Sequence, residues 1–207
     1  MNIVAECGCN WTSIEEAKEM IMRSKEIGCW GSKFQLFTGY EAPDVPAYLY
    51  MSFGQAKELV DYGKSINQRV FFTPMYLEAI DFLESIDIGY YKIRYKDRWN
   101  IPLVKKILET NKPYFTSYDL NDFYEYCVPY YYTNIRPLLC VPLYPATFTD
   151  YKGIVTFGYS DHTPDFKLLE FAKRHNAIWF EKHVKLEGTE PLENDWSVTF
   201  EELREII

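Results

Sequence analysis

The sequence has no segment that would direct the chain to a membrane. Its start carries no cationic stretch, and no apolar run approaches the roughly twenty residues that span a bilayer. A clustered excess of lysine and arginine is also missing, because the net charge is -8 and the isoelectric point is near 5.0. Nucleic acid is therefore not the expected partner, since phosphate binding needs such a cluster. We expect a soluble, cytoplasmic protein with no nucleic-acid and no membrane partner.

Cysteine pairs at metal-binding or redox spacing are missing as well. The cysteines are Cys7, Cys9, Cys29, Cys127 and Cys140. Their odd number and the lack of a CxxC pair favour reduced thiols over a disulfide framework or a structural zinc site. Cys7 and Cys9 leave a weak soft-metal site open, but small residues at a strand end are the favoured interpretation. No GxGxxG follows the first expected strand, which argues against an open dinucleotide-binding sheet.

What the sequence does contain is an eightfold alternation of short β-branched or aromatic runs with amphipathic stretches. Strands are expected near 3–6, 32–37, 70–73, 90–94, 114–117, 138–141, 154–159 and 178–183. Helices are expected near 13–28, 53–66, 76–86, 101–111, 121–126, 165–176 and 199–207. The segment between the sixth and seventh strands is too short and proline-bearing for a full helix. The α/β pattern predicts a compact, single-domain (β/α)8 TIM barrel over residues 1–207.

Two runs near the C-terminus, 158–163 and 180–183, place polar side chains at the ends of two expected strands. Alternate residues of a strand share a face, so Ser160 pairs with His162 and Glu181 with His183. Two imidazoles with carboxylate or water oxygens suit a borderline divalent metal. The alternative is that each histidine is a hydrogen-bonded core residue, which is less attractive for a matched pair than for a single histidine.

Other strand ends also carry polar residues. Glu6 ends the first strand, Lys33 and Gln35 share a face of the second, and the third, fourth and fifth strands end near Thr73, Lys92 and Ser117. Lysines and hydroxyls converging on one mouth would hold an anionic, phosphate-bearing substrate. Taken singly, a lysine at a barrel end is usually a solvated rim residue, and a single serine or threonine commonly caps a helix or turn. The tyrosine-rich run 126–132 is interpreted as a surface loop or cap in preference to a sugar-stacking wall.

A series of short motifs runs in order along the chain, at residues 5–10, 33–35, 72–74, 91–93, 100–103, 112–113, 140–141, 144–145, 158–163 and 181–183. In these motifs the chain resembles the sialic acid synthase (NeuB) family of N-acetylneuraminate synthases. The most specific motifs are GYSDHT at 158–163 and EKH at 181–183. The resemblance implies a TIM barrel that condenses phosphoenolpyruvate with an N-acetylated, N-acetylmannosamine-like hexose. The expected products are a sialic-acid-type nonulosonic acid and phosphate, with Mn²⁺ or another divalent metal as cofactor.

The same resemblance implies roles for individual residues. His162 and His183 match the metal ligands. Contacts to phosphoenolpyruvate match Lys33, Thr73, Lys92, Ser117 and Ser160, and Gln35 and Tyr144 are further substrate-binding candidates. Acidic catalytic residues near the reacting carbons and the acceptor match Glu6, Glu181 and Asp195.

Several positions differ from the family pattern. The expected Lys-Ile-Ala-Ser reads Lys92-Ile93-Arg94-Tyr95, Pro142 replaces an asparagine, and Trp11 replaces a histidine. Tyr95 and Pro142 favour an alternative function, a barrel that binds an acidic or phosphorylated sugar with little or no turnover. A metal-dependent ulosonate aldolase is a third hypothesis. The family's C-terminal antifreeze-like domain has no counterpart in this sequence, so a homodimer or a separately encoded partner domain is expected to complete the site.

Overall fold

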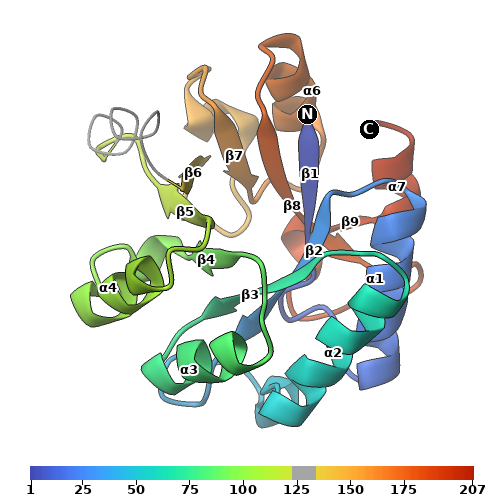
Figure 1. The fold of residues 1–207 in the computed structure, drawn as a ribbon. Coiled ribbons are helices and arrows are strands. Elements are labelled where there is room, and N and C mark those ends of the chain that lie inside the picture. Colours follow the sequence, from blue (N-terminus) through green and yellow to red (C-terminus); the bar gives the residue numbers. More distant parts are fainter. Residues whose placement is uncertain (123–133) are drawn as a thin grey trace.

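Eight parallel strands close into a ring in the computed structural model, which describes residues 1–122 and 134–207 (Figure 1). In chain order the strands are β1 (Asn2–Glu6), β2 (Gly31–Leu36), β3 (Val70–Pro74), β4 (Tyr91–Ile93), β5 (Tyr114–Tyr118), β6 (Ile135–Cys140), β7 (Gly158–Asp161) and β8 (Trp179–Lys185). Each strand pairs with the next, and β1 pairs with β8 to close the ring. The predicted TIM barrel is confirmed.

The helices lie outside the ring of strands (Figure 1). They are α1 (Ile14–Glu26), α2 (Phe53–Ser65), α3 (Leu77–Ser85), α4 (Ile101–Glu109), α6 (Lys167–Arg174) and α7 (Phe200–Arg204). Local sequence fixes several of their starts. Ser13 accepts a hydrogen bond from the Glu16 amide, and Ser52 forms a capping box with Gln55. No helix in the described part of the chain is long and apolar enough to cross a membrane.

The structure corrects the expected seventh strand, which begins at Gly158 and not at Ile154. A turn with Lys152 and Gly153 at positive φ precedes it. The Tyr159 hydroxyl donates to the Ile154 carbonyl at 2.6 Å, so the apolar residues before Gly158 belong to a folded-back loop. Between β6 and β7 the structure has only a 3₁₀ turn, Phe148–Tyr151, as the short proline-bearing segment predicts. A short strand β9 (Val198–Thr199) pairs with β8 and was not expected.

Apolar side chains fill the barrel at the N-terminal ends of the strands. Trp30 makes edge contacts there with Phe71, Tyr90, Phe115 and Trp179, with ring centroids 4.8 to 5.9 Å apart. A larger core lies between the strands and the helices. Aromatic rings thus close one end of the barrel, and the C-terminal ends of the strands, where TIM-barrel sites lie, form the other end.

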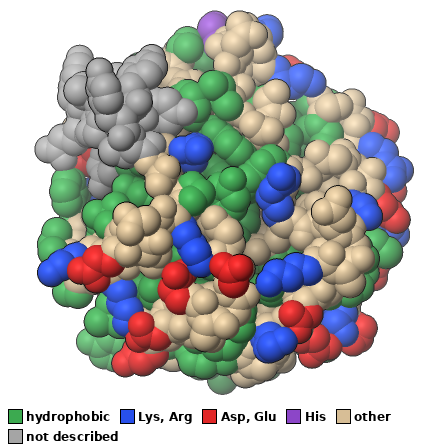
Figure 2. All heavy atoms as spheres, viewed as in Figure 1, with side chains coloured by type: hydrophobic (Ala, Val, Ile, Leu, Met, Phe, Trp, Pro, Cys, Tyr) green, Lys and Arg blue, Asp and Glu red, His purple; other side chains and the backbone are tan. Residues whose placement is uncertain are grey.

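The outer surface carries charges of both signs. In Figure 2, acidic and basic side chains lie next to one another along the lower and right edges. Several are ion pairs on or between helices, such as Lys18 with Glu58 and Lys106 with Asp81. Part of the helix expected near 121–126 and all of the tyrosine-rich run 126–132 lie outside the described residues.

Candidate active site

A cavity of about 170 Å³ opens at the C-terminal ends of the strands. Every residue predicted for the site lines it except Asp195. These residues are Glu6, Lys33, Gln35, Thr73, Lys92, Ser117, Tyr144, Ser160, His162, Glu181 and His183. Further lining residues are Arg94, Tyr95, Lys96, Cys140 and Glu193. The side chains that the strand alternation placed on common faces therefore meet in one cavity.

Strand register explains how residues distant in sequence come together. Glu6 of β1 lies between Lys33 of β2 and His183 of β8, because it pairs with both. Ser160 of β7 pairs with Glu181 of β8, and its hydroxyl donates to that carboxylate at 2.8 Å. In parallel strands, partners on the same face project side by side into the barrel. The closed ring therefore brings the first and last strands to one site.

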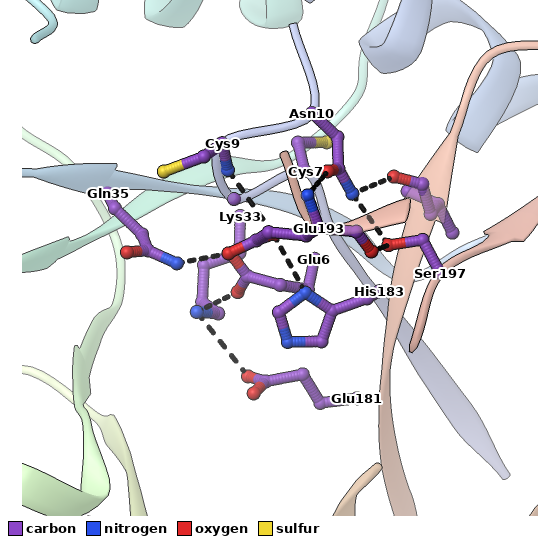
Figure 3. A network of polar contacts seen from close by, with 12 residues as sticks. Glu6, Cys7, Cys9, Asn10, Lys33, Gln35, Glu181, His183, Glu193 and Ser197 are labelled. Carbon is purple, nitrogen blue, oxygen red and sulfur yellow. Dashed lines mark hydrogen bonds and ion pairs between the residues drawn. The ribbon is translucent and has the colours of Figure 1, made fainter. Parts of the chain in front are cut away.

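Buried lysines and carboxylates alternate in the cavity, and Figure 3 shows Lys33 between Glu6 and Glu181. Lys33 pairs with Glu6 and lies 3.8 Å from Glu181. Lys92 contacts both oxygens of Glu181 at 3.1 Å. Lys33 also donates to the Thr73 hydroxyl at 3.1 Å. All four charged residues are at most 4% exposed. Two ammonium groups thus stand where an anionic ligand could reach them, each already held by a carboxylate.

The environment shifts the pKa of both Lys33 and Glu181. Burial lowers the pKa of Lys33 from 10.5 to about 8, although the neighbouring Glu181 charge opposes the shift. Burial alone would raise the pKa of Glu181, but the charges of Lys33 and Lys92 outweigh it and lower that pKa to about 2. Near neutral pH the site therefore holds a mostly charged Lys33 beside a charged Glu181 carboxylate.

The two histidines lie close together, with ring centroids 5.4 Å apart. The Nδ1 atom of each ring has a hydrogen-bond partner. The His162 Nδ1 lies 2.8 Å from the Val141 carbonyl oxygen, which can only accept, so this nitrogen carries the proton. Burial lowers the pKa of His162 to about 3, which keeps the ring neutral. The His183 Nδ1 lies 2.9 Å from the Glu193 carboxylate. The Nε2 of His162 is thus left with a free lone pair.

These features fit a divalent metal held by the two imidazoles. Histidines that bind metals usually give their second ring nitrogen to a carboxylate or a backbone carbonyl, the arrangement found at His183 and His162. Within residues 1–122 and 134–207, no group of three or more His, Cys, Asp or Glu side chains is arranged to hold a metal ion. Any ion held here would take its remaining ligands from water or substrate.

Asp195 does not reach the cavity, contrary to the expected grouping. It is exposed in the 3₁₀ turn Asn194–Trp196, whereas Glu193, two residues earlier, lines the cavity. The Glu193 carboxylate also accepts from the Cys9 amide at 3.3 Å. Gly8 makes this approach possible, because a Cβ there would lie 2.1 Å from a Glu193 oxygen. The loop after β8 has several acidic residues, and no local sequence pattern singles out Glu193.

The residues after β4 form a tightly connected rim. The Tyr95 hydroxyl donates to Asp119 at 2.9 Å, and the Arg98 guanidinium lies 3.8 Å from the centre of the Tyr95 ring. Arg94 lines the cavity and is paired with Asp97. After β6, the Tyr144 ring packs on His162, with ring centroids 4.2 Å apart. Tyr95 is therefore fixed by its neighbours where it borders the cavity.

Fold and cavity together define a TIM barrel with a polar, lysine- and carboxylate-lined site at the C-terminal ends of its strands, the location of active sites in TIM-barrel enzymes. The chain belongs to the NeuB family, whose model matches residues 16–207. The resemblance seen in the sequence motifs is thereby confirmed.

The relatives of this chain include two bacterial synthases, each named for the acid that it makes. The chain is 26% identical to the N,N'-diacetyllegionaminic acid synthase of Campylobacter jejuni, over 89% of this chain and 67% of that protein. It is 25% identical to the pseudaminic acid synthase of Helicobacter pylori, over 90% of this chain and 60% of that protein. The solved N-acetylneuraminic acid synthetase of Leptospira borgpetersenii has the same fold, with a TM-score of 0.88 at 20% identity over 99% of this chain and 80% of that one. The chain thus spans roughly two thirds of the length of the two named synthases.

Proposed function

We propose that the protein condenses phosphoenolpyruvate with an N-acetylated aldose to give a sialic-acid-type nonulosonic acid and phosphate. The observation that carries the proposal is the pair of buried lysines, Lys33 and Lys92, beside hydroxyls of Thr73 and Ser160. Buried ammonium groups with hydroxyl donors suit a small ligand that bears both a phosphate and a carboxylate. Membership of the NeuB family supports the same reaction.

In this proposal the enol carbon of phosphoenolpyruvate forms a bond to the acceptor's aldehyde carbon. Water adds to the neighbouring phosphate-bearing carbon, and phosphate leaves as the C–O bond to it breaks. Glu181 is well placed to hold that water, because its carboxylate is buried and fixed by Ser160 and Lys92. Lys33 and Lys92 offset the charge of the leaving phosphate.

A divalent ion such as Mn²⁺ would be held by His162 and His183. When bound, it would supply a Lewis acid that polarises the acceptor aldehyde. The protein's own contribution is to keep the His162 ring neutral and oriented through the Val141 carbonyl. A homodimer or a separately encoded partner domain, and a cytoplasmic location, belong to the same proposal.

The reaction is tested by incubating the protein with phosphoenolpyruvate, Mn²⁺ and a panel of N-acetylhexosamines while measuring inorganic phosphate. We expect release only when an acceptor aldehyde is present. Glu181→Gln should abolish this release while phosphoenolpyruvate still binds, because a group that acts in the transition state affects turnover more than binding. Glu109→Gln, on the exposed surface of α4, is the matched control.

The second candidate function is binding without turnover. It is favoured by Tyr95, which stands in place of a small hydroxyl and is fixed at the cavity by Asp119 and Arg98. Wild-type protein that binds phosphoenolpyruvate yet releases no phosphate with any acceptor would support this function and contradict the first.

A further inference from the structure

An ion pair joins β7 and β8 on the face of the strands opposite the cavity. Asp161 and Lys182 pair in the strand register, and the Lys182 ammonium lies 2.9 Å from the Asp161 carboxylate. Both side chains are fully buried, at 0% exposure. Asp161 follows Ser160, and Lys182 follows Glu181. The two strands are therefore joined by Ser160 and Glu181 on the cavity face and by Asp161 and Lys182 on the other face.

The same pair holds the backbone around His162. Lys182 donates to the Thr163 carbonyl, and the Asp161 carboxylate accepts from the Thr163 amide at 2.8 Å. Both backbone groups of Thr163 are thereby fixed to residues of the pair. His162 lies between Asp161 and Thr163, so its backbone is constrained on both sides at the point where β7 ends.

Stability alone is a poor reason for such a pair. Removing two charges from water is costly, and apolar residues of similar volume are often as stable or more stable in their place. What the pair supplies is a defined register with directional bonds to Thr163. Because His162 and His183 are the direct neighbours of Asp161 and Lys182, that register sets how the two imidazoles face each other.

We propose that Asp161 and Lys182 are positioning residues that hold His162 against His183 in the geometry required for metal binding. The part of this inference that concerns metal binding rests on the proposed function. The part that concerns the orientation of the His162 ring does not, because the hydrogen bond between His162 Nδ1 and the Val141 carbonyl exists without any ion. The pair acts through the backbone of Thr163 and does not touch the cavity.

The test uses the double variant Asp161→Asn with Lys182→Met, which keeps side-chain volume and removes both charges. Mn²⁺ affinity is measured by electron paramagnetic resonance, and the tautomers of isotope-labelled histidine rings by NMR. We expect the Mn²⁺ dissociation constant to rise about 10- to 100-fold, as for other outer-shell partners of metal ligands. We also expect His162 to lose its single Nδ1-protonated tautomer, while the exposed His175 is unchanged.

Gln68→Leu is the matched control, because it removes a buried polar group at the other end of the barrel. Gln68 donates to Cys29 and Ser32, so its loss should lower the melting temperature without changing Mn²⁺ affinity or the His162 tautomer. If the double variant is too unstable, Asp161→Asn alone keeps an acceptor for the Thr163 amide and should shift both measurements in the same direction.

Two outcomes separate this inference from the proposed function. A folded variant with wild-type Mn²⁺ affinity and an unchanged His162 tautomer would overturn the positioning role. Wild-type protein that takes up no Mn²⁺ would contradict the proposed metal site. In that case the NMR comparison still decides whether the pair orients His162.

Discussion

The low pKa of Lys33 predicts that phosphoenolpyruvate binding weakens as the pH rises above neutrality. Burial lowers the pKa of Lys33 to about 8, so about nine tenths of the lysine is charged at pH 7 and about one tenth at pH 9. If only the charged form holds the ligand, the apparent dissociation constant rises about tenfold between these values. Burial raises the pKa of Cys140 to about 12, so this neighbouring thiol does not titrate in the same range.

A rise in pH should have the opposite effect on folding, because Lys33 then contributes more to the free energy of unfolding. Weaker binding can therefore be distinguished from unfolding. The pKa of Lys33 in the folded protein lies below its ordinary value of 10.5. The unfolded chain therefore binds more protons between pH 8 and 10.5, and the contribution of Lys33 to the free energy of unfolding rises with pH. Weaker binding at pH 9 would then not come from a loss of stability caused by this residue.

Isothermal calorimetry with wild type, Lys33→Met and Lys57→Met provides the assay. Lys33→Met removes a charge-assisted hydrogen bond of about 1.5 to 3 kcal/mol, which corresponds to about 10- to 150-fold weaker binding at pH 7. It should also abolish the pH dependence. Lys57, exposed on α2 and paired with Asp61, should behave as wild type when replaced. A wild-type dissociation constant that stays flat from pH 7 to 9, or an unchanged slope in Lys33→Met, would refute the reasoning.

The remaining predictions concern the metal, the second lysine and the core. His162→Ala should abolish Mn²⁺ binding in calorimetry, whereas His175→Ala should not; equal affinity of wild type and His162→Ala would contradict the metal site. Lys92→Met should weaken phosphoenolpyruvate binding by about 10- to 150-fold, and an unchanged affinity would assign the anchor to another cation. In helix α2, Gly63→Ala should lower stability by about 1 to 3 kcal/mol, because its Cβ would lie 2.5 Å from a β3 side chain. Gly54→Ala in the same helix is exposed and should be neutral or stabilising by up to about 1 kcal/mol in chemical denaturation, so equal losses at both positions would contradict this packing argument.

The barrel itself could be predicted because its signals are local. Strand alternation, the capping serines Ser13 and Ser52, and the eightfold repeat of elements are each written within a few residues of sequence. Where a local signal misled, a side-chain hydrogen bond was the reason. The apolar residues after Gly153 satisfy a strand pattern, but the hydrogen bond from Tyr159 to Ile154 holds them in a loop.

The residues of the candidate site also fall into those that the sequence predicts and those that it does not. Side chains at strand ends, such as Lys33, Ser160 and His183, could be assigned to the cavity from sequence because the direction of a strand side chain follows from its position. Glu193 could not, because it reaches the cavity from an irregular loop after β8. Its place depends on contacts with Cys9, at the other end of the chain, and with His183.

The sequence by itself therefore determined the fold, the family motifs and which strand residues face the site. Only the tertiary structure decided how these residues neutralise one another, with Lys33 between Glu6 and Glu181, and which loop acid stands behind His183. The physical reason is the difference in the range over which these interactions act. Periodicity and capping act over a few residues along the chain, whereas ion pairing and burial depend on distances across the closed barrel that exist only after β1 has met β8.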